Sequence, residues 1–168
     1  DLRTFKCRAG RAGCGQQTLV IAEDNFGVSA HIDNQAHLVT QMRRLGQQHC
    51  CRIGADVTTR ITTEATLVFD GKTLPPGEYS MFADLANPTA WTLVFSNLGA
   101  KESFQEETEN AVWGGYGYTD GLDVLRAPMT VSEHPVSADQ LIVAFTDMTQ
   151  QGGNLTIWFA DQIATIPF

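Results

Sequence analysis

The stretches 141–145 (LIVAF) and 155–159 (LTIWF) decide the fold that we expect for this chain. In both, every second residue is a large apolar one, which is the side-chain period of a β-strand with one face on a core. The residues in between are also mostly apolar, so we expect both strands to be central ones. The same alternation at 67–69 and 91–96 extends the strand pattern over the last two thirds of the chain.

Turn residues separate these runs. The dipeptide 70–71 (DG) suits a tight hairpin because glycine adopts a positive φ without steric cost. The segments 75–77 (PPG) and 152–154 (GGN) read as two further turns, since proline fixes φ and glycine permits a chain reversal. Short strands with such punctuation are typical of an antiparallel β-sandwich, so we predict an all-β sandwich domain at residues 51–168.

Three other segments are less regular. Residues 35–45 have partly helical spacing and end before Gly46, whereas residues 103–111 read as a short helix or a loop. The closing segment 163–168 is expected to be a final edge strand that stops near Pro167.

Length and charge limit the possible partners. The chain has 168 residues and a mass of 18.4 kDa, which fits one domain with an added arm. Its formal net charge of −8 disfavours a nucleic-acid partner, which needs a basic face. No apolar run approaches the roughly 18 residues of a membrane span, so we expect none.

The charge is unevenly distributed. Residues 1–60 hold eight basic and five acidic residues, a net charge of +3, which leaves −11 for the remainder. We interpret residues 1–50 as an N-terminal arm that packs on the acidic domain of the same chain or between further copies of it. Two solvated surfaces of unlike charge are the alternative.

The cysteines point to the compartment. The chain has an even number of them without the Cys-x-x-Cys spacing of a zinc site, namely Cys7, Cys14, Cys50 and Cys51. We predict two disulfides that join the first two to the last two in either order, because neighbours on a strand point to opposite faces. Disulfides and the start at Asp1 fit a secreted, periplasmic or cell-surface protein, although a trimmed chain would start in the same way. Four free thiols in the cytosol are the alternative.

Three motifs follow one another in a fixed order: 52–56 (RIGAD), 69–82 (FDGKTLPPGEYSMF) and 113–126, which runs from Trp113-Gly114 to Leu125-Arg126. Together they resemble the bacterial domain-of-unknown-function family 2911 over about residues 50–168. The resemblance implies a β-rich, usually exported domain without an established activity.

The chain also departs from that family's pattern. Pro76 stands where an alanine is usual, and Cys51 stands where a tryptophan commonly precedes the arginine. The stretch 97–112 looks like an insertion, and residues 1–45 show little of the family's upstream pattern.

Polar residues of these motifs form the first candidate cluster. Two arginines and two acids occupy family-typical positions, namely Arg52, Asp56, Asp123 and Arg126. They either line a polar pocket or form bidentate pairs that pin strand ends, and we favour the structural role. Tyr79, after the proline-glycine turn, is expected to bury its ring and to hydrogen-bond a loop carbonyl.

A glycine-rich loop provides the predicted ligand site. It carries three aromatic residues followed by a carboxylate, namely Trp113, Tyr116, Tyr118 and Asp120. Exposed rings of this kind stack on sugars, while the carboxylate accepts hydrogen bonds from hydroxyl groups. In the alternative, Trp113 and Tyr118 only cover the open end of the sandwich. The nearby Glu102, Glu106, Glu107 and Glu109 read as a solvated loop rather than a calcium site, because they lack the spacing of a known loop motif.

The function that we expect is therefore a non-catalytic one. The chain has no Gly-x-Ser-x-Gly elbow, phosphate loop or dinucleotide fingerprint, and we predict no catalytic residue, cofactor or metal site. We predict an exported module that builds part of an extracellular or cell-surface assembly, with further copies of itself as partners through the arm, or that binds an extracellular ligand. A carbohydrate-binding domain with a glycan partner, or a glycan or ester hydrolase, is the alternative.

Overall fold

The computed structural model describes residues 16–17, 28–33, 50–53, 57–87 and 89–168. These residues form β-strands and their connections, apart from one short 3₁₀ helix, η1 (Asp120–Leu122). The predicted all-β class is confirmed. In this part of the chain, no helix has the length and apolarity needed to cross a membrane.

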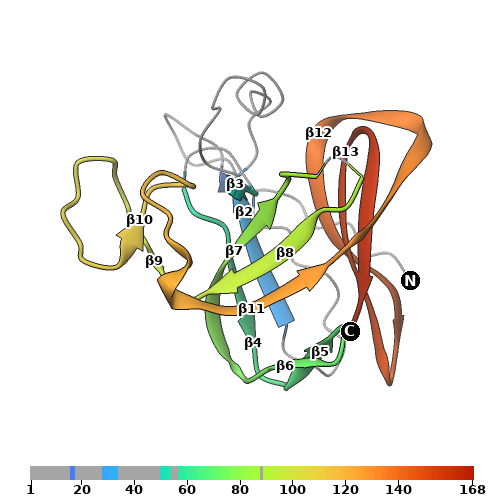
Figure 1. Cartoon of the computed structure of the whole chain (residues 1–168), viewed down its shortest axis with the longest axis horizontal. Helices are drawn as coiled ribbons and strands as arrows, with labels where there is room; N and C mark the ends of the chain where they lie inside the picture. Colours follow the sequence, from blue (N-terminus) through green and yellow to red (C-terminus); the bar gives the residue numbers. More distant parts are fainter. Residues whose placement is uncertain (1–15, 18–27, 34–49, 54–56, 88) are drawn as a thin grey trace.

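A mainly sequential antiparallel sheet forms the centre of the molecule (Figure 1). Its strands are β1 (Gln16–Gln17), β2 (Val28–Asp33), β3 (Cys50–Arg52), β4 (Arg60–Thr63), β7 (Gly77–Asp84), β8 (Thr92–Ser96) and β11 (Asp123–Pro128). They follow the order β1-β2-β4-β7-β8-β11. β3 and β4 pair with the same edge of β7: β4 pairs with residues 77–80 and β3 with residues 82–84. β1 and β2 come from the segment that we predict as an arm, and they extend this sheet.

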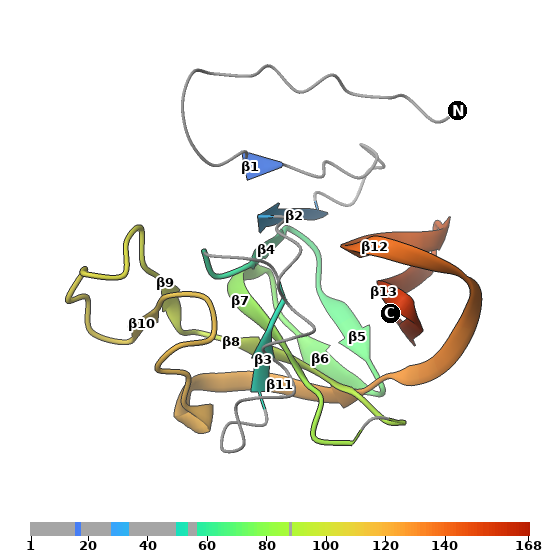
Figure 2. The same ribbon diagram turned by 90° about the horizontal axis from the view of Figure 1, so that it is seen from above.

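Two hairpins lie against one face of the sheet (Figure 1 and Figure 2). β5 (Leu67–Phe69) and β6 (Lys72–Leu74) are joined by Asp70 and Gly71, whose φ values of 50° and 73° confirm the predicted turn. The longer hairpin consists of β12 (Thr130–Thr149) and β13 (Gly152–Pro167). The second layer consists of two separate two-stranded sheets rather than one continuous sheet, so the complete sandwich stays a prediction.

The main core lies between the sheet and the hairpins. Its fully buried members come from the alternating positions of several strands, among them Ile61, Phe69, Met81, Leu93, Phe95, Leu155 and Ile157. Tyr79 belongs to the same core, and its hydroxyl donates to Pro75 O at 2.9 Å, as we predicted. The alternation of apolar residues thus does decide which side of each strand is buried.

The end of the chain closes the long hairpin on itself. Phe168 N donates to Gly153 O at 2.9 Å, and Gly153 N donates to Phe168 O at 3.1 Å. The Phe168 ring packs near Phe69 and Phe145, with centroids 5.6 and 5.5 Å away. β13 is the last strand and ends at Pro167, as expected for the closing segment 163–168, but it begins as early as Gly152, so this segment is the end of a longer strand.

The opposite face of the sheet carries a smaller apolar cluster. Phe82, Val94, Leu98 and Val112 are buried there, and Tyr118 and Leu122 pack against them. The connection from β8 to β11 covers this cluster and contains β9 (Gly99–Ala100), β10 (Ala111–Val112) and η1. It lies across the sheet from the β12–β13 hairpin in both views (Figure 1 and Figure 2). Residues 103–110 form a loop rather than a helix, and the possible helix at 35–45 lies outside the described residues.

Candidate functional site

The connection between β8 and β11 is held together at its base by backbone contacts. Gly99 N donates to Asn110 O at 2.7 Å, and Lys101 N donates to Val112 O at 3.0 Å. The two segments approach closely because residue 99 has no side chain: a Cβ there would lie 3.2 Å from the Ala111 Cβ. The loop from 101 to 110 therefore projects from a closed, hydrogen-bonded neck.

Buried hydroxyl groups fasten this connection to the sheet. Thr58 Oγ1 lies 2.7 Å from Val112 O and 3.1 Å from Gly114 O, so that its proton is shared between the two carbonyl oxygens. Ser80 Oγ on β7 donates to Leu98 O at 2.6 Å. Val112 O accepts from Lys101 N as well, whereas for Gly114 O and Leu98 O the hydroxyl groups are the described partners. Because these contacts are buried away from water, they fix the loop base in place.

Two exposed aromatic side chains meet at the outer side of this connection, and we call Phe104 and Tyr116 the aromatic pair. The exposed fraction is 56% for Phe104 and 70% for Tyr116. Their ring centroids are 5.4 Å apart and their planes are inclined by 55°. A single exposed apolar residue is common on protein surfaces, whereas these two exposed rings are in contact and form one continuous apolar surface.

The position of Tyr116 follows from the glycine-rich turn that carries it. Tyr116 N donates to Trp113 O at 2.9 Å, and the flanking Gly114 and Gly117 have φ values of 59° and 84°. Residues with a Cβ adopt such angles only with strain, so the glycines allow this turn to form. Trp113 itself is partly buried.

The loop that carries Phe104 is acidic. Residues 101–110 hold four glutamates against Lys101, a net charge of −3. One of the four closes the loop internally: the Glu106 carboxylate accepts hydrogen bonds from Glu102 N at 2.7 Å and from Thr108 Oγ1. The hydrogen bond from Thr108, together with that from Glu102 N, lowers the pKa of Glu106 below its usual value.

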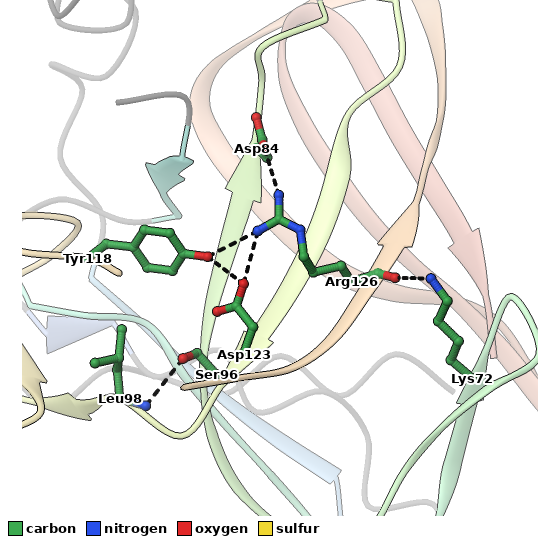
Figure 3. A network of polar contacts seen from close by, with 7 residues as sticks. All are labelled: Lys72, Asp84, Ser96, Leu98, Tyr118, Asp123 and Arg126. Carbon is green, nitrogen blue, oxygen red and sulfur yellow. Dashed lines mark hydrogen bonds and ion pairs between the residues drawn. The ribbon is translucent and has the colours of Figure 1, made fainter. Parts of the chain in front are cut away.

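A network of polar side chains lies beside this site, on the same face of the sheet (Figure 3). Arg126 Nη2 lies 2.6 Å from Asp84 Oδ2, and Arg126 Nη1 lies 2.9 Å from Asp123 Oδ2. The Tyr118 hydroxyl accepts from Arg126 Nη1 at 3.1 Å and donates to Asp123 Oδ2 at 2.6 Å. Burial opposes the charge of Arg126, but Asp123, Tyr118 and Asp84 outweigh it and raise the pKa of the guanidinium group.

The contacts of this network connect the covering loop to the sheet. The Tyr118 ring packs on Phe82, with centroids 4.9 Å apart, so its hydroxyl links the covering loop to the sheet. The Asp123 side chain is only 8% exposed, and its Oδ2 is shared by Tyr118 and Arg126. Its other oxygen, Oδ1, is buried and has no hydrogen-bond partner among the residues described.

The residues that we predicted as one ligand site differ in exposure. Tyr116 and Asp120 are exposed, whereas Trp113 is partly buried and Tyr118 is engaged in the polar network. Phe104 was missed, although it is the one large apolar residue in the acidic stretch 101–110 and could have been noticed there.

The predicted polar cluster is described only in part. Asp123 and Arg126 do pair, but the second carboxylate on Arg126 is Asp84, which sequence reasoning missed. Arg52 is placed by its backbone in β3, opposite Phe82, and Asp56 lies outside the described residues.

The other predicted site residues remain untested. Cys50 and Cys51 are placed by backbone alone in β3, and Cys7 and Cys14 lie outside the described ranges, so the disulfides stay a prediction. Among the described residues, no three His, Cys, Asp or Glu side chains gather as a metal-binding group.

Comparison with known proteins gives one match. The family model described as "Protein of unknown function (DUF2911)" matches residues 39–168. No curated protein and no solved structure matches the chain significantly.

Proposed function

Because the chain belongs to the DUF2911 family, whose function is unknown, we propose a function from its geometry: an exported, non-catalytic module that binds an extracellular ligand through the aromatic pair. The single observation that carries this proposal is the contact between two rings that are both more than half exposed, Phe104 at 56% and Tyr116 at 70%. A partner that covers them removes apolar surface from water, which is worth about 25 cal/mol per Å².

The attachment of the two loops favours binding over a chance exposure of two rings. Thr58 ties the turn of Tyr116 to the sheet, and the β9–β10 neck closes the loop of Phe104. Side chains held in position before binding lose less conformational entropy when a ligand arrives. The aromatic pair is thus suited to recognition, since the backbone that carries its rings is anchored before a ligand arrives.

The polar network supports a non-catalytic role. A catalytic acid, base or nucleophile has to reach a substrate from a concave site. Here the guanidinium group of Arg126 is shared by Asp84, Asp123 and Tyr118, all within 3.1 Å of it. Export rests on the predicted disulfides, and non-reducing mass mapping of the four cysteines in protein from its native host tests it.

The proposed binding is tested with the full-length chain and a panel of extracellular polymers, which includes neutral oligosaccharides, acidic oligosaccharides and basic peptides. Ring signals of Phe104 and Tyr116 in ¹H–¹³C spectra should shift with at least one member, and Tyr116→Ala should abolish that binding. Val136→Ala is the matched control, because Val136 is 59% exposed on β12, across the sheet from the aromatic pair. If no member shifts the ring signals, or if Tyr116→Ala binds as the unmodified chain does, the proposal is wrong.

Self-assembly is a second candidate, and the charge distribution favours it. Residues 61–168 hold fourteen carboxylates and three cations, whereas residues 1–60 carry a net charge of +3. Opposite charges on two parts of one chain favour contact between copies at low ionic strength. Light scattering should then show species well above 18.4 kDa that dissociate as salt is added, and a monomer at all concentrations would exclude this candidate.

A further inference from the structure

We propose that the aromatic pair receives a lysine or arginine side chain of an extracellular polypeptide. This inference rests on the proposed function and adds the chemical class of the ligand. Two properties of the site carry it, namely the angle between the rings and the charge of the loop around them.

The angle between the rings distinguishes the ligand classes. The two rings are in tilted contact, with planes inclined by 55° and centroids 5.4 Å apart, so their π faces are differently oriented. A sugar ring stacks best on one flat, open aromatic face. A cation needs no such platform, because it is attracted when it lies over the face of a single ring within about 6 Å of its centroid. The aromatic pair therefore suits an ammonium or guanidinium group better than the broad face of a sugar.

The charge around the aromatic pair selects the same class. Phe104 lies in the turn 103–106, where Glu106 N donates to Ser103 O at 3.2 Å, and Glu102 and Glu107 flank this turn. The Glu106 carboxylate accepts hydrogen bonds from within the loop. The carboxylates of Glu107 and Glu109 have no hydrogen-bond or ion-pair partner among the residues that the structure describes. These carboxylates are free to attract a cation that sits on the rings.

The wider surface strengthens this selection. Of the three cations in residues 61–168, Arg126 is paired with two carboxylates and Lys72 Nζ donates to Arg126 O at 2.6 Å. Lys101 is the one cation in the sequence of the acidic loop itself. An acidic field of this kind draws basic segments to the site and repels phosphate groups and acidic sugars.

The test uses the full chain with fluorescein-labelled hexalysine as the probe, and unlabelled hexaglutamate and cellohexaose as competitors. Fluorescence anisotropy gives the dissociation constant, and ¹H–¹³C spectra report the Phe104 and Tyr116 rings. The variants are Phe104→Leu and Tyr116→Leu, which keep an apolar side chain and the net charge but remove the π face. Both side chains are exposed, so the variants should fold, and circular dichroism checks this.

We expect hexalysine to shift both ring signals and each leucine variant to bind it about threefold or more weakly, with Val136→Ala unchanged. Equal binding of hexalysine by the leucine variants would show adsorption by charge alone and would overturn the inference. A shift of the rings by cellohexaose but not by hexalysine would also overturn it, while leaving the proposed function in place. If neither probe nor any other polymer of the panel moves the rings, the proposed function fails as well.

Discussion

Arg126 on β11 reaches across β8 to Asp84 on β7, where Arg126 Nη2 lies 2.6 Å from Asp84 Oδ2. The same guanidinium group donates hydrogen bonds to the Asp123 carboxylate and to the hydroxyl group of Tyr118. One side chain on β11 thus reaches β7, two places away in the sheet, and the loop that covers these strands. The loop layer that presents the aromatic pair is consequently fixed to the sheet at Arg126 as well as at Thr58.

Arg126→Met should lower the free energy of unfolding by about 1–3 kcal/mol, because it leaves the carboxylate of Asp123 in a largely buried place without its cation. Urea unfolding followed by tryptophan fluorescence measures the change. The matched control is Arg60→Met. Arg60 Nε lies 2.8 Å from Glu78 Oε1, and the Glu78 side chain is 55% exposed. Exposed pairs contribute about 1 kcal/mol or less, so an equal loss in both variants would contradict the structural role of the network.

Thr58→Val should lower the free energy of unfolding by about 1–3 kcal/mol, because Gly114 O loses its described hydroxyl partner in a buried place. Faster hydrogen exchange of the Lys101 amide, which donates to Val112 O, should accompany this loss. Thr62→Val on the exposed side of β4 serves as the control. Unchanged exchange at Lys101 would argue against Thr58 as the anchor of the loop.

Gly152→Ala should be strongly destabilising, by about 2 kcal/mol or more. A Cβ at residue 152 would lie 1.9 Å from Phe168 O, and the residue has a φ of 149°. The comparison variant is Gly121→Ala, where a Cβ meets no atom within 4 Å, and it should stay within about 0.5 kcal/mol of the unmodified chain. Similar thermal unfolding of the two variants would show that the chain end does not close against Gly152.

The order of the acidic loop should depend on pH through Glu106. A carboxyl group whose pKa is lowered on folding contributes its contacts above its unfolded pKa and loses them as the pH falls through its folded pKa. The amide signals of Glu102 and Thr108 should therefore change below pH 4.5, the usual value of this group, and not above it. In Glu106→Gln this transition should be absent, and its persistence there would mean that another group controls the loop.

Sequence reasoning succeeded where a structural rule repeats locally. Phe95 and Leu155 are buried because successive side chains of a strand point to opposite faces, and this period is visible in the sequence. The contact of Tyr79 with Pro75 O was also predictable, since the two residues belong to one turn. The strand pattern and the hairpin turn at Asp70 and Gly71 are therefore visible in the sequence. The turn predicted at 152–154 is misplaced, because it lies at residues 150–151 and Gly152 already begins β13.

The candidate site could not be predicted in the same way, because its contacts depend on which strands are neighbours. Asp84 and Arg126 are 42 residues apart and meet only because β8 lies between their strands. Phe104 and Tyr116 are twelve residues apart in a connection without a regular period. No local pattern reports that these two rings touch.

The most direct test of the proposed binding surface is a nuclear Overhauser experiment on the ligand-free chain, with labelled phenylalanine and tyrosine rings. Centroids 5.4 Å apart predict strong cross-peaks between the ring protons of Phe104 and Tyr116. These cross-peaks should vanish in Phe104→Leu. If the unmodified chain shows no such cross-peaks, the two rings do not form one surface and the proposed recognition site does not exist in the free protein.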